Sequence, residues 1–189
     1  MRIRCCFAGI PLLLMILSGS ALSQTHKPEP VRTVSQALDF WITNTEHLVV
    51  PAADAMPEEK YSFAPTGAGF IGVRTFAQQI KHLAANNFRM AAYILNQTPT
   101  ADQMAETGPE AVQTKAQIME YVKGSFAALH RAMATLTPEN LVEPMAVSPS
   151  PGQTTRLQLA EDVVAHSSNH YGQMVEYLRM NGIVPPASR

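Results

Sequence analysis

The residues of this sequence best suited to chemistry are two histidines four positions apart, His166 and His170. Residues four apart lie on the same face of a helix, so both imidazoles can reach a single metal ion. At about 100° per residue, Leu159, Val163, Gln173 and Tyr177 fall within about 60° of His166 around the helix. The pair is therefore predicted to face the protein interior, where imidazole nitrogens without partners are costly to bury.

The spacing alone leaves two interpretations open, a pair of metal ligands or a structural pair. The segment is not a zinc peptidase motif, because Ser167 stands where such a motif has its glutamate general base. A catalytic divalent ion also needs a third protein ligand.

The candidates for a third ligand are His47, His82 and His130. His47 lies well off the apolar stripe of its helix and is expected to be exposed. His130 lies close to the apolar face of its helix and could be a histidine at the edge of the core. His82 lies on a polar flank with Gln79 and Asn86, which would line a cleft. Helical phase does not decide between His82 and His130.

Three neighbouring residues are candidates to contact the ligands. Asp162 lies one turn before His166 and could orient its ring or move a proton, although a capping or pairing role near the helix start is favoured. Asn86 follows His82 by one turn, and Gln173 faces inward beside His170. The catalytic residue stays unknown.

Four segments with apolar residues at helical spacing would position these side chains: 33–52, 75–96, 109–136 and 155–182. Thr33 with Gln36, and Thr155 with Gln158, form capping boxes. The connection 137–152 contains four prolines and is predicted to be a long ordered crossing. No strand-like alternation of useful length occurs. The sequence thus predicts an all-α protein, an antiparallel four-helix bundle.

The first 23 residues have the layout of a secretory signal peptide: a basic start, an apolar run and small residues before Gln24. A membrane anchor is disfavoured, because the apolar run is shorter than the ~20 residues of a spanning helix. We expect residues 24–31 to be a flexible tether and residues 32–189 to be the bundle domain. The mature protein would be exported, periplasmic or secreted, with no stable membrane span.

Composition excludes several functions. Loss of Arg2 and Arg4 with the signal leaves 12 basic and 15 acidic residues, a net charge of −3, which argues against nucleic acid as a partner. Cys5 and Cys6 also leave, so no thiol chemistry remains. The methionines follow helical stripes and are interpreted as core rather than a copper site. A homodimer is a possible assembly, although no exposed apolar stripe argues for one.

From about Val34 onward, the chain resembles the DinB family. The resemblance rests on residues 55–61 (AMPEEKY), 76–82 (FAQQIKH), 166–173 (HSSNHYGQ) and 177–186 (YLRMNGIVPP). It implies a DinB-like four-helix bundle in which one histidine of the second helix and the paired histidines of the fourth bind one divalent metal ion. These positions correspond to His82, His166 and His170, so the resemblance selects His82 over His130.

The resemblance also implies a cofactor and a function. The metal is expected to be nickel or zinc, with manganese or iron as alternatives, and to keep a position free for water or substrate. The expected activity is that of a metal-dependent hydrolase or thiol-type transferase acting on an unknown small molecule. Export sets this chain apart from relatives that use a cytosolic thiol. The alternative is a non-catalytic metal-binding or stress-associated bundle protein.

Overall fold

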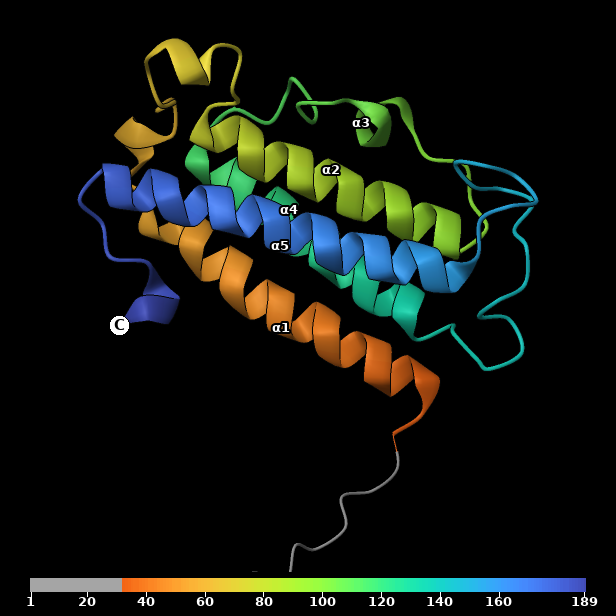
Figure 1. Ribbon diagram of the computed structural model, residues 1–189. Helices are drawn as coiled ribbons and strands as arrows, with labels where there is room; N and C mark the ends of the chain where they lie inside the picture. The colour runs from red at the N-terminus through yellow and green to blue at the C-terminus, as the bar shows by residue number, and fades with distance from the viewer. Residues whose placement is uncertain (1–31) are drawn as a thin grey trace, which may run out of the picture. The chain divides into compact units, whose positions relative to one another are not determined.

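The computed structural model describes residues 32–189, and the predicted signal peptide (1–23) and tether (24–31) lie outside them. The described regular structure is helical (Figure 1). Four long helices carry the fold: α1 (Val34–Ala55), α2 (Phe76–Ile94), α4 (Lys115–Met133) and α5 (Arg156–Met180). The short elements are α3 (Ala101–Met104) and the 3-10 turns Glu58–Lys60, Ala68–Phe70 and Pro186–Ser188.

Each α-helix in this part of the chain begins with the same local device. A threonine side chain accepts a hydrogen bond from the backbone N–H three residues on, and a glutamine at that position bonds back to the threonine N–H. The threonines are Thr33, Thr75, Thr100, Thr114 and Thr155. The predicted start near Pro109 is wrong: α4 begins after Thr114, where the capping box satisfies its first N–H groups.

Hydrogen bonds between helix ends define the direction of each helix. The backbone N–H of Phe76, which opens α2, donates to the carbonyl of Phe63 just beyond α1. The Nζ of Lys115, which opens α4, donates to the carbonyl of Asp54 at the end of α1. At the same end, the Nζ of Lys60 donates to the carbonyl of Asn181, which closes α5. Thus α2 and α4 begin where α1 and α5 finish (Figure 1).

It follows that α2 and α4, which pack side by side, run parallel to each other and antiparallel to α1 and α5. The sequence predicts an antiparallel bundle, and two packed pairs, α2 with α4 and α1 with α5, are parallel instead. For α2 and α4 the reason is their connection: residues 95–114, with α3 inside, form a crossover that leads back along α2 to the end where both helices begin.

The crossover packs tightly on α2 at Gly108. This residue has φ of 68°, a left-handed conformation that glycine adopts without strain. A Cβ at this position would also lie 2.9 Å from Cβ of Lys81. The close approach places the segment around Glu106 against the side chain of the next residue on α2, His82.

A small polar network inside the core fixes the helices around the site. The amide of Asn87 on α2 donates to Oγ of Ser125 on α4, at 3.2 Å, and accepts from Oγ of Ser167 on α5, at 3.3 Å. All three side chains are fully buried. Because Ser167 adjoins His166, this network helps to set the rotation of α5 at the candidate site.

The remaining core is apolar, built from the inward stripes of the four long helices, with Phe76 and Phe126 as its largest fully buried side chains. Across residues 32–189, no helix has both the length and the apolar character that a membrane span requires.

Candidate metal centre

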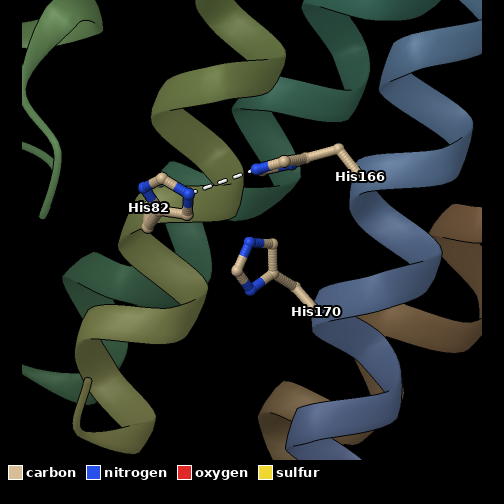
Figure 2. A group of neighbouring side chains, drawn as sticks. All are labelled: His82, His166 and His170. Atoms are coloured by element: carbon tan, nitrogen blue, oxygen red, sulfur yellow. Dashed lines mark hydrogen bonds between the residues drawn. The ribbon is translucent and has the colours of Figure 1, made fainter. Parts of the chain in front are cut away.

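His82 from α2 and His166 and His170 from α5 point toward a common centre (Figure 2). One ring nitrogen of each lies within 4.8 Å of those of the others. The closest pair is Nε2 of His82 and Nε2 of His166, at 3.2 Å. The structure therefore brings together the three histidines that the resemblance selects. Elsewhere in the fold, His47 is exposed, and His130 bonds to Asp39 and Glu46 between α4 and α1.

The ring of His82 is held from behind by the crossover. Its Nδ1 lies 2.6 Å from the backbone carbonyl oxygen of Glu106, so Nδ1 carries the proton and donates it. The lone pair of the neutral ring is then on Nε2, which faces the other histidines. The Glu106 carboxylate lies 3.5 Å from the same Nδ1 and also accepts from Arg74 at 2.8 Å. Such a partner behind the ring is characteristic of histidines that bind metals.

The ring of His170 is held in the same manner by a side chain. Its Nδ1 lies 2.7 Å from Oε1 of Gln79, one turn before His82 on α2. Since an amide oxygen only accepts, Nδ1 is the donor and Nε2 keeps its lone pair. Both His170 and Gln79 are buried.

His166 is half-buried and is held differently. Its Nδ1 is buried and has no hydrogen-bond partner among the described residues. With the proton of His82 on Nδ1, the 3.2 Å contact between the two Nε2 atoms can be a hydrogen bond only if His166 donates. Two nitrogens bound to a tetrahedral ion at 2.0–2.1 Å lie about 3.3 Å apart. The spacing of these two atoms thus fits a shared cation.

The surroundings keep all three rings neutral. Burial is the largest cause that lowers the pKa of His166, to about 3, and repulsion from a proton on His170 or His82 adds to it. Burial likewise lowers the pKa of His170 to about 4, and the positive charges of a protonated His82 and of Arg74 add to it. Burial also lowers the pKa of His82. Neutral imidazoles are the form that binds a metal, so at neutral pH protons do not compete for these ligands.

The family model of the DinB superfamily matches residues 42–174, a segment that contains all three histidines. The chain belongs to the DinB superfamily. A comparison with curated proteins finds no match. The resemblance read from the sequence is confirmed at the level of the family, and the three histidines of this DinB superfamily member could hold a metal ion.

The other candidate residues of this DinB superfamily chain lie around the cluster at different depths. Asn86 is buried, and its Oδ1 accepts from Nη2 of Arg89 at 2.6 Å. Gln173 is half-buried, and its amide donates to Asn169 at 2.8 Å. Asp162 is exposed near the start of α5 and borders a cavity of about 550 Å³.

Two residues that hold the ligand rings are not identified by the sequence: Gln79 and Glu106. The sequence puts Gln79 on the polar flank of His82, but its contact with His170 depends on how α2 packs against α5. Glu106 lies in a connection and acts on His82 through its backbone carbonyl, which every residue type has. Only the path of the crossover identifies it.

Proposed function

We propose that His82, His166 and His170 bind one divalent metal ion, and that the protein is an exported metal-dependent hydrolase or thiol-type transferase acting on a small molecule. The observation that carries this proposal is the cluster itself: three neutral imidazoles with converging nitrogens. Two of these rings are held by acceptors on their far nitrogens.

The donor set favours particular metals. Imidazole nitrogens suit nickel and zinc, and manganese and iron are the alternatives. Three neutral ligands do not offset the charge of a divalent ion, and they leave a coordination position for a further ligand. When bound, such an ion supplies Lewis acidity that polarises a substrate oxygen or stabilises a thiolate.

The protein residues around the cluster would orient these ligands. Gln79 holds the ring of His170, and the Glu106 carbonyl holds the ring of His82. Both rings therefore already have the orientation in which Nε2 faces the metal position. The carboxylate of Glu106, close to Nδ1 of His82, would make that imidazole a stronger donor to the metal.

Metal content tests the proposal directly. The protein is purified without chelators or nickel resin, and its metal is measured beside that of the variants His82→Ala, His166→Ala and His170→Ala. We expect about one metal ion per chain in the wild type, loss in each of the three variants, and retention in His130→Ala. A wild type that takes up neither zinc, nickel nor manganese would refute the proposal.

One observation favours the alternative of a non-catalytic metal-binding or stress-associated protein. His82 is 9% exposed and His170 is 7% exposed, so two of the three ligands are largely shielded from solvent, whereas His166 is half-buried. The two functions differ in access to the ion. Azide or a small thiol added to the cobalt-loaded protein should change its visible absorption spectrum if a coordination position is free, and an unchanged spectrum would favour the non-catalytic role.

Export is part of the proposal and rests on the sequence of residues 1–23. N-terminal sequencing of the processed protein should find Gln24 as the first residue. The proposed partner is a small-molecule substrate, with no role for nucleic acid. The homodimer stays a prediction, which the molecular mass in solution tests.

A further inference from the structure

The residues beyond His82 on α2 continue the face that carries the site. Asn86 and Arg89 follow His82 by four and seven residues, so all three lie on one side of the helix. Helix α5 runs antiparallel to α2, with His170 beside Gln79 and His166 beside His82. Asn86 and Arg89 therefore lie toward His166, at the end of the cluster opposite Gln79.

Arg89 brings a positive charge to this end of the cluster. Among residues 32–189, no salt bridge to Arg89 is present, whereas Arg74 is paired with Glu106 at 2.8 Å. The half-buried side chain of Arg89 contacts Asn86, which lies one turn beyond His82 on the same face of α2. A cation beside a site for a divalent cation weakens metal binding, unless an anion lies between them or beside them.

Two buried donors at the same end also lack acceptors. Oδ1 of Asn86 accepts from Arg89, so the amide orientation is fixed and Nδ2 points elsewhere. That Nδ2 is buried without a hydrogen-bond partner among the described residues, in a side chain that is 3% exposed. Nδ1 of His166 is in the same situation, and it is a donor once Nε2 is used for a metal.

A guanidinium and two unpaired N–H donors have one common complement, a group that only accepts hydrogen bonds and carries negative charge. We infer that Arg89, Asn86 and His166 form the recognition site for an oxyanion, the carboxylate or the phosphate-type group of the small molecule bound at the metal centre. This inference rests on the proposed function, because it places the anionic group of the ligand beside the metal.

Anion binding is measured by calorimetry on the zinc-loaded protein, with acetate and sulfate as probes. We compare the wild type with Arg89→Gln and Asn86→Ala, and use Arg131→Gln, an exposed arginine on α4, as the matched control. Arg89→Gln should weaken binding at least about tenfold, since a charge-assisted hydrogen bond is lost, and Arg89→Lys should restore part of it. Tighter binding of acetate would indicate a carboxylate ligand, and tighter binding of sulfate would indicate a phosphate-type group.

A second readout separates this site from the metal itself. Zinc affinity in the absence of anions should be unchanged or higher in Arg89→Gln, because a repelling charge has been removed. Thermal unfolding confirms that the variants fold. Equal anion binding in wild type and Arg89→Gln would overturn the inference, as would no binding to the wild type. If the wild type binds no metal, the proposed function fails, and titration of the metal-free protein still decides whether Arg89 holds an anion.

Discussion

At the scale of single residues, the candidate site depends on the atoms behind each imidazole as much as on the imidazoles. His82 and His170 use Nδ1 for a hydrogen bond and so present Nε2 to the centre. Fixing the tautomer and the ring in advance removes a cost that would otherwise accompany metal binding.

Gln79 gives the sharpest test of this support. In Gln79→Ala, Nδ1 of His170 loses its acceptor, the ring becomes free to turn, and zinc affinity should fall about 10–100-fold. Gln97→Ala, at an exposed position beyond the end of α2, is the control and should leave zinc affinity unchanged. Competition with a zinc-binding dye measures both. Equal losses would mean that Gln79 does not orient the ring.

The sequence allowed the ligands to be predicted but not their supports, for a physical reason. Two histidines one turn apart share a face wherever the helix lies, so His166 and His170 are paired by local geometry. His82 and Gln79 meet them only through the packing of α2 against α5. The choice of His82 over His130 came from the family resemblance and not from phase.

At the scale of elements, the crossover 95–114 determines the parallel packing of α2 and α4 and also places Glu106 against His82. Helices α1, α2 and α5 begin close to where their sequence patterns predict, because the threonine and glutamine of a capping box act locally. The short helix α3 has too few residues for a periodic pattern, and the sequence pattern predicts the start of α4 near Pro109, before its true start after Thr114. The parallel packing of α2 and α4 depends on the path of the connection, which local patterns do not encode.

Gly108 tests the role of the crossover. Gly108→Ala places a side chain in a left-handed conformation and against Lys81, so the segment must move away from α2. We expect destabilisation by more than the ~1–2 kcal/mol of the backbone strain alone, together with weaker metal binding as Glu106 leaves His82.

The control for this change is Gly152→Ala. Gly152 has a similar φ of 77°, but no atom lies within 4 Å of its added Cβ. Gly152→Ala should lose stability only through the backbone strain, because no steric clash arises, and its metal affinity should be unchanged. Urea unfolding and zinc titration measure the two effects. Equal behaviour of the two variants would contradict a role for the crossover in the site.

At the scale of the whole molecule, two groups of histidines respond to pH in opposite directions. Burial by itself would lower the pKa of His130, but hydrogen bonds to Asp39 and Glu46 raise it above the ordinary 6.5. Its stabilising contribution is present below pH 6.5 and is lost as pH rises through the raised value. The metal-site histidines stay neutral when folded, so the metal-free protein loses stability as pH falls from about 6.5 toward 4.

The thermal unfolding of two variants tests these opposite dependences of stability on pH. His130→Gln should lower the unfolding temperature more at pH 6 than at pH 9, because the contact between α4 and α1 is charged only at the lower pH. In the metal-free protein, His166→Gln should instead gain stability relative to wild type as the solution becomes more acidic. A pH-independent difference for either variant would contradict the corresponding assignment.

The distance in sequence between the ligands has a consequence for the folding of the chain. His82 and His166 are 84 positions apart, and the segment between them contains α3, α4 and both long connections. An ion held by both would close a loop of about half the chain, and long loops are those for which closure restricts the chain most. Metal binding is reversible, so the stability of the fold against heat and proteases would increase with the concentration of free metal around the protein.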